Sequence, residues 1–237
     1  MIMPKLAAVL ALILLLSGCG TDIYSSADRG EFTGRIFLMW IDDGGSSGDG
    51  TFVYVPVPGH ELTFTRQKNQ SATLTTIVPE MMYTDGGSIP RVAQVFKGFS
   101  PWGYAPAYMV HDWIFIAKNC NTDGMAKGEE LKVGKMKFDE SAAIMAEAIK
   151  TLVAQNMVKR ADVAERLIPA IVGGPIARDL WNRNGACAAR RVSEADRQAA
   201  LAGLPGARIS LRDMVRTLDD GHTIPVKPAR IITEIGF

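Results

Sequence analysis

Two short polar motifs in the middle of the chain hold residue types that can carry acid–base or metal chemistry. The first is a turn at 84–91 with the sequence Thr-Asp-Gly-Gly-Ser-Ile-Pro-Arg, and the second is the tripeptide His111-Asp112-Trp113. A further carboxylate, Asp139, opens the next periodic segment. An imidazole can take a proton from water near neutral pH, and a carboxylate can orient the imidazole or bind a cation. The residues of interest in the turn are Asp85, Gly86, Gly87, Ser88 and Pro90.

The same residues also have a purely structural interpretation. His111 would then be a buried histidine that is hydrogen-bonded to Asp139, while Asp85 and Ser88 would brace a tight turn through bonds from side chain to backbone. Ser88 is a poor candidate nucleophile because the Gly-x-Ser-x-Gly elbow is absent around it. The sequence leaves the catalytic and the structural interpretations open.

The first residues are typical of a bacterial lipoprotein signal peptide. Lys5 precedes the apolar run Leu6–Leu16, which is too short for a stable membrane span. The run ends in Leu16-Ser17-Gly18-Cys19, which resembles a lipobox and implies that Cys19 is lipidated with acyl chains such as palmitate. We therefore expect a signal peptide over 1–19 and a protein held to the membrane by lipid on Cys19. It would face the periplasm in the bacterial cell envelope, at the outer membrane in a Gram-negative cell.

Composition limits the classes of partner. The chain has 237 residues with 26 basic and 25 acidic side chains, and it has no basic stripe with interleaved aromatic residues. These features argue against a nucleic-acid partner. The length after the signal suffices for one domain. We expect a tether over 20–30, a main domain over 31–186 and a C-terminal extension over 187–237.

Two cysteines remain once Cys19 is assigned to lipid. An exported protein folds in an oxidising compartment, where the thiols of Cys120 and Cys187 would tend to pair. The sequence alone cannot place their Cα atoms within bonding range. A disulfide and two buried free thiols therefore both stay open.

Hydrophobic periodicity predicts an α+β fold, in which N-terminal antiparallel strands precede a helical part that carries the His-Asp motif. Segments with strand character are Phe32–Ile41, Thr51–Val57, Glu61–Arg66 and Ala72–Val78. Segments with helical character are Ala105–Lys118, Phe138–Leu152, Ala161–Val172, Ile176–Asn184 and Val192–Ala202. We expect Asn121–Lys135 to be a loop and the tail that ends in Ile231-Ile232-Thr233 to be peripheral.

The motifs resemble those of the DUF1353 family of bacterial and phage proteins. The resemblance rests on Val78-Pro79, the turn at 84–91, the tripeptide at 111–113 and Phe138-Asp139. It covers about 31–184 and implies a shared fold, without a settled activity.

A His-Asp dipeptide on one helix with an aspartate on the next is also similar to small prokaryotic phospholipases A2. This similarity implies that His111 is the general base, that Asp112 binds Ca²⁺ and that Asp139 orients the imidazole. The chain lacks the Gly-Cys-Gly calcium loop of those enzymes, so Asp85 and the carbonyls beside it would have to complete the metal site. Two functions follow: a hydrolase of phospholipids or other esters, and a non-catalytic envelope or phage-derived structural or interaction protein.

Overall fold

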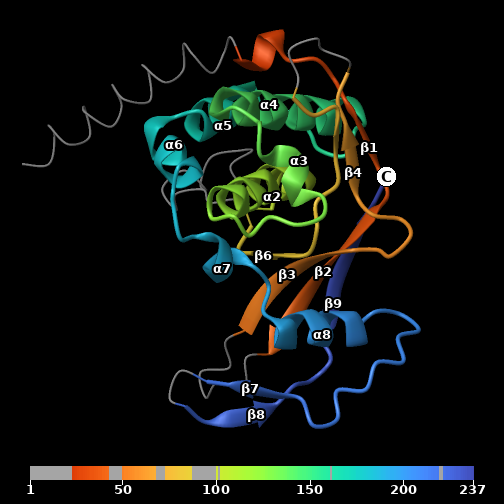
Figure 1. Cartoon of the computed structure of the whole chain (residues 1–237). Coiled ribbons are helices and arrows are strands. Elements are labelled where there is room, and N and C mark those ends of the chain that lie inside the picture. The colour runs from red at the N-terminus through yellow and green to blue at the C-terminus, as the bar shows by residue number, and fades with distance from the viewer. Residues whose placement is uncertain are drawn as a thin grey trace, which may run out of the picture.

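The computed structural model describes residues 23–42, 50–67, 73–86, 100, 102–160, 162–218 and 221–237. It confirms the predicted α+β class, because antiparallel strands come first and helices follow (Figure 1). No helix among these residues is long and apolar enough to cross a membrane.

A four-stranded antiparallel sheet lies at the centre of the described part. Its strands, in spatial order, are β6 (Met82–Thr84), β3 (Gly50–Pro56), β2 (Arg35–Asp42) and β9 (Arg230–Gly236). The C-terminal tail was expected to be peripheral. That expectation is wrong for residues 230–236, which form β9 of this sheet. This strand pairs with β2 from Arg35–Gly236 to Trp40–Arg230 and closes an edge that would otherwise expose unpaired backbone groups.

Both faces of this sheet are buried, because successive side chains of a strand point to opposite sides. Ile36, Leu38 and Tyr54 face a core that they share with most of the helices. Phe37 and Met39 face a second core, which is covered by the helix at 194–202. In Figure 1 the helix that carries the His-Asp motif lies above the sheet and the 194–202 helix lies below it.

A smaller sheet stands beside the central one and contains β1 (Glu31–Thr33), β4 (Thr63–Thr65) and β5 (Thr76–Ile77). The single strand expected over Phe32–Ile41 is therefore two strands, β1 and β2. The break falls at Gly34, which has a φ of +84° and where a Cβ atom would lie 2.1 Å from the carbonyl oxygen of Glu61. Only glycine fits this close approach with this backbone. A two-stranded ribbon of β7 (Val215–Thr217) and β8 (Thr223–Pro225) follows late in the chain.

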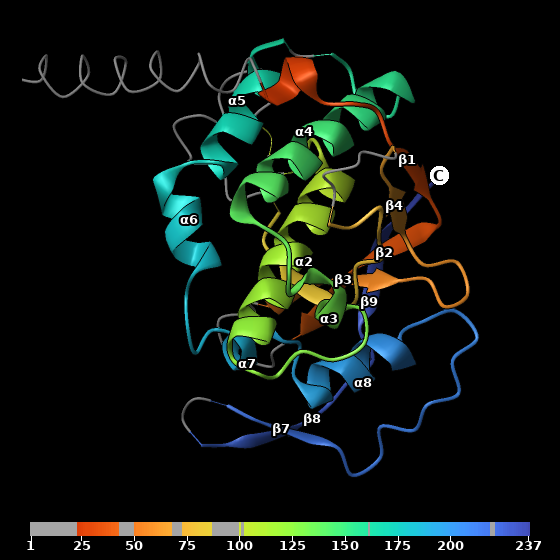
Figure 2. The same cartoon turned by 45° about the horizontal axis from the view of Figure 1, so that its top comes forward.

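The helices pack mainly on one side of the sheet, and Figure 2 shows α4 to α6 grouped around α2. They are α2 (Ala105–Thr122), α3 (Glu130–Val133), α4 (Phe138–Ala154), α5 (Asp162–Val172), α6 (Pro175–Trp181), α7 (Cys187–Arg190) and α8 (Glu194–Ala202). The loop expected over Asn121–Lys135 is wrong in part, because α2 extends into it and α3 lies within it. Asn121 donates a 2.6 Å hydrogen bond to the Glu130 carbonyl, and Val133 is fully buried. These contacts hold a helical turn in a stretch with little apolar periodicity.

Candidate functional site

The His-Asp motif lies on α2, the helix that runs through the larger core. His111 is 4 % exposed, and its ring packs 4.7 Å from the ring of Phe115. Its Nδ1 atom lies 3.4 Å from the Oδ1 atom of Asp112. Its Nε2 atom is buried and has no hydrogen-bond partner among the described residues. Most buried polar atoms are paired, so an unpaired imidazole nitrogen marks this position as a candidate site.

Three buried tyrosines belong to the same region, and the sequence analysis assigned them no role. Tyr54 comes from β3, while Tyr104 and Tyr108 stand at the start of α2 with ring centroids 6.2 Å apart. The hydroxyl oxygens of all three lack a hydrogen-bond partner within the described part of the chain. Tyr108 is three residues before His111, so helical spacing was a signal for it. Tyr54 reaches the region through tertiary packing, for which the sequence carries no signal.

The environment of these tyrosines keeps their hydroxyls protonated at neutral pH. Burial raises the pKa of Tyr104 to about 12, and the charge of Glu165 adds to the effect. Burial raises the pKa of Tyr54 and Tyr108 as well, and the charge of Asp112 adds to the rise in both. The nearby hydroxyl of Thr84 opposes the rise at Tyr54. Each hydroxyl is therefore a hydrogen-bond donor in a buried setting, and none makes a hydrogen bond within the described residues.

Asp85 and Asp112 both lie close enough to Tyr54 for their charges to raise the pKa of that tyrosine. Asp85 is exposed just after β6, and the Asp112 side chain is 41 % exposed. Calcium takes about six to eight oxygen ligands, more than these two carboxylates supply. The described residues contain no group of three or more His, Cys, Asp or Glu side chains that could hold a metal ion. Asp85 and Asp112 alone therefore do not make up a calcium site, and the Ca²⁺ site stays a prediction because Gly87 and Ser88 lie outside the described residues.

The glycine-rich turn is described only at its start. Gly86 has a φ of +86°, and its N–H donates a 3.0 Å hydrogen bond to the hydroxyl of Thr84. Thr84 thus braces the part of the turn that is described. Gly87, Ser88 and Pro90 lie outside the described residues, and so does Cys19.

Asp139 has no contact with His111 in this structure and is bonded to Arg178 instead. Its side chain is 84 % exposed in the first turn of α4, and it accepts a 3.0 Å hydrogen bond from Arg178 on α6. The Arg178 guanidinium also lies 4.5 Å from the centroid of the Phe138 ring. The carboxylate next to the imidazole in this structure is that of Asp112, whereas the similarity to phospholipases implied Asp139.

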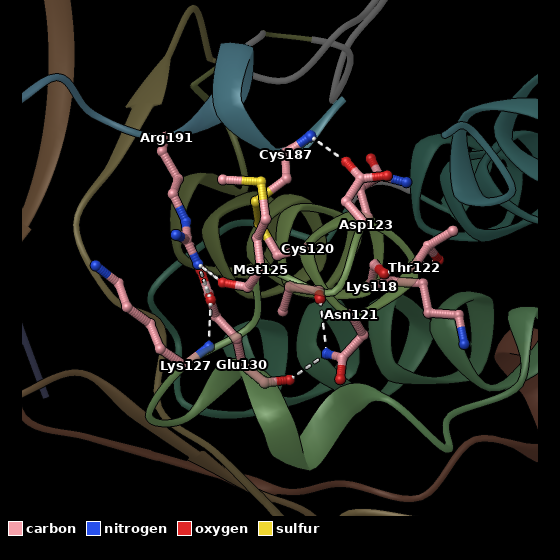
Figure 3. Close-up of a disulfide and its surroundings, with 12 residues drawn as sticks. Lys118, Cys120, Asn121, Thr122, Asp123, Met125, Lys127, Glu130, Cys187 and Arg191 are labelled. Carbon is pink, nitrogen blue, oxygen red and sulfur yellow. Dashed lines mark hydrogen bonds and ion pairs between the residues drawn. A yellow bond between two sulfur atoms is a disulfide. The ribbon is translucent and has the colours of Figure 1, made fainter. Parts of the chain in front are cut away.

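Cys120 and Cys187 form a disulfide, with a Cα–Cα distance of 4.6 Å (Figure 3). It joins the last turn of α2 to the first residue of α7. The carboxylate of Asp123 reinforces this junction, since it accepts hydrogen bonds from the backbone N–H groups of Cys187 at 2.9 Å and Gly185 at 2.7 Å. These two bonds, with that from Cys187 the stronger influence, lower the pKa of Asp123. The disulfide and Asp123 thus hold α7 against the C-terminal end of α2.

One comparison with known proteins gives a match, and it covers the candidate site except for Tyr54. Residues 61–161 match the model of a family described as a protein of unknown function, DUF1353. The match supports the predicted resemblance to the DUF1353 family over these residues. It includes the turn, the His-Asp motif and Asp139, and it leaves out β1 to β3, the helices from α5 onward and Cys187. No curated protein and no solved structure matches the chain.

Proposed function

We propose that this protein is a lipid-anchored protein of the bacterial cell envelope that faces the periplasm. The observation that carries the proposal is the Cys120–Cys187 disulfide, in which both cysteines are fully buried. Disulfides persist in oxidising compartments such as the periplasm and are rare in the cytosol. The lipobox-like sequence before Cys19 supplies the route to such a compartment and an anchor at its membrane.

Metabolic labelling with palmitate tests the anchor. The full chain and its Cys19→Ser variant would be expressed in a Gram-negative host, followed by fractionation of the membranes. We expect label and membrane association in the unchanged chain and loss of both in the variant. Absence of label from the unchanged chain, or equal label in both chains, would contradict the proposal.

A second candidate function is ester hydrolysis at His111, and the unpaired Nε2 atom of that residue favours it. In this scheme Nε2 takes a proton from water while the water oxygen forms a bond to the ester carbonyl carbon. The oxygen that becomes negative would accept hydrogen bonds from tyrosine hydroxyls such as that of Tyr108. The imidazolium then returns the proton to the departing alcohol oxygen as the C–O bond breaks.

Fatty-acid release from a mixed phospholipid panel tests this candidate. The detergent-purified full chain, His111→Asn and the control His60→Asn would be assayed with calcium and with chelator, since His60 is exposed. Release that is lost in His111→Asn and kept in His60→Asn supports hydrolysis, and loss with chelator would add Ca²⁺ to the site. No release from the folded chain favours the non-catalytic envelope or phage-derived interaction protein, in which His111 serves only packing.

A further inference from the structure

A cavity of about 280 Å³ lies beside the disulfide, on a different part of α2 from His111. Trp113 and Ile116 of α2 line it together with Met81, which precedes β6. These three side chains give it an apolar wall. The volume is near the lower end of the range for small-molecule sites, so an occupant would be small.

Apart from Val192, the rest of the lining is charged, with more cations than carboxylates. The cations are Lys127, Arg190, Arg191 and Arg197, and the carboxylates are Glu80 and Glu130. The cavity would therefore favour an anion over a neutral or cationic molecule of the same size.

Most of these arginines already have carboxylate partners. Arg191 donates to Glu130 through both Nε and Nη2. Arg197 donates to Glu194 at 2.8 and 2.7 Å. Arg190 is different, since it has no hydrogen bond or ion pair among the described residues although it is partly buried. It is therefore the guanidinium in this cavity that is left for a ligand.

The electrostatic setting of Arg190 agrees with this assignment. Burial lowers its pKa, the positive charge of Arg183 lowers it further, and the charge of Asp112 opposes the fall. The guanidinium is thus partly desolvated, and no carboxylate among the described residues forms an ion pair with it. A ligand carboxylate would accept two parallel hydrogen bonds from such a guanidinium.

We propose that this cavity binds a small organic carboxylate, with Arg190 as its anchor and Trp113 against its apolar part. The planar fork of Arg190 fits one carboxylate group, and the apolar wall fits the organic part of such a ligand, which inorganic phosphate lacks. The proposal is separate from the hydrolysis at His111, because neither His111 nor the tyrosine hydroxyls line the cavity.

The disulfide gives this carboxylate pocket a fixed shape. Cys120 and Trp113 lie on the same helix, and Cys187 precedes Arg190 by three residues on α7. Figure 3 shows Arg191, the residue after Arg190, bonded to Met125 and Glu130 in the surroundings of the disulfide. The covalent link therefore holds the apolar wall and the anchoring arginine at a set separation.

Isothermal titration of the detergent-purified full chain with benzoate tests the proposal. We expect saturable binding of benzoate with one site per chain. The affinity of Arg190→Gln should be at least about tenfold lower, because the variant loses a charge-assisted hydrogen-bonded pair. The matched control is Arg208→Gln, which removes an exposed arginine that does not line the cavity and should bind as the unchanged protein does. Arg190→Lys keeps the charge without the fork and should bind with intermediate affinity.

Comparison ligands sharpen the outcome. Benzamide, which is neutral and of similar shape, should not bind measurably. Absence of benzoate binding, equal binding by a folded Arg190→Gln variant, or tighter binding of inorganic phosphate than of benzoate would overturn the proposal. If Arg190→Gln fails to fold, the comparison between the unchanged chain and Arg190→Lys decides it, and equal affinities would count against Arg190 as the anchor.

Discussion

Arg66 donates hydrogen bonds to Glu147 at 2.6 and 2.8 Å, although the two residues are 81 positions apart. A further bond of 2.5 Å runs from Arg66 to Glu140. The arginine follows β4 and both glutamates lie on α4, so the cluster joins the smaller sheet to the helical layer. Burial lowers the pKa of Arg66, but the bonds and charges of Glu147 and Glu140 outweigh that effect and raise it. The side chain is only 4 % exposed, which makes this a buried ionic cluster.

Replacing Glu147 should strongly destabilise the fold. Glu147→Ala leaves a buried guanidinium short of a partner, which typically lowers the free energy of unfolding by about 3–5 kcal/mol. Glu31→Ala, at an exposed position of β1, should stay within about 0.5 kcal/mol of the unchanged chain. Urea unfolding followed by circular dichroism measures both, and similar values for the two variants would contradict the role assigned to the cluster.

Asp139→Asn should have little effect on stability. Its pair with Arg178 is exposed, and exposed pairs contribute about 1 kcal/mol or less. If His111 acts as a base, the variant should also keep its hydrolysis rate, because the Asp139 carboxylate is bonded to Arg178 instead of the imidazole. Parallel unfolding and ester-hydrolysis measurements check both statements. A rate loss as large as that of His111→Asn would show that Asp139 moves to the imidazole during the reaction.

Loss of the disulfide should destabilise the chain through its unfolded state. The two cysteines are 67 positions apart, and closing a loop of that length removes chain entropy worth about 4 kcal/mol. The Cys120→Ser, Cys187→Ser double variant should therefore unfold at clearly lower urea concentration. Reductant should shift the midpoint of the unchanged chain and leave that of the variant in place. A reductant effect of equal size on both would contradict this account.

The buried tyrosines predict a loss of stability at alkaline pH. An ordinary tyrosine titrates near 10, and burial raises the pKa of Tyr104 to about 12. Tyr104 thus holds its hydroxyl proton more tightly in the folded state than in the unfolded state. Its contribution to the free energy of unfolding is therefore complete below pH 10 and falls as pH rises toward 12. Tyr104→Phe should flatten this fall. Unfolding free energies measured over that pH range test it, and a fall of the same steepness in the variant would contradict it.

The same substitution tests whether the hydroxyl is unpaired. Removing an unpaired buried hydroxyl removes a desolvation penalty of about 1–3 kcal/mol, so Tyr104→Phe should not destabilise the protein at neutral pH. A clear destabilisation would mean that the hydroxyl has a partner, such as an ordered water molecule.

Local patterns predicted the elements whose partners are near in sequence. The apolar stripe from Phe138 predicted α4, and strand character at 32–41 and 51–57 predicted β2 and β3, which pair with each other. The helix α3 escaped prediction because it is held by polar contacts of Glu130 instead of an apolar stripe. For the site, sequence could propose His111 and Asp112 as a unit. It could not foresee that Asp139 would face Arg178, since the order in which helices pack around α2 decides that contact.

The pairing of β9 with β2 also sets a limit on when the protein can finish folding. The backbone ladder from Arg35–Gly236 joins segments about 200 positions apart, so the sheet lacks its edge strand until residues 230–236 have been synthesised. Contacts of such long range slow folding and leave β2 open in the meantime. A translation product that stops before 230 would keep that edge exposed, as a template on which other chains could add strands. The sheet is therefore complete only in a chain that includes residues 230–236.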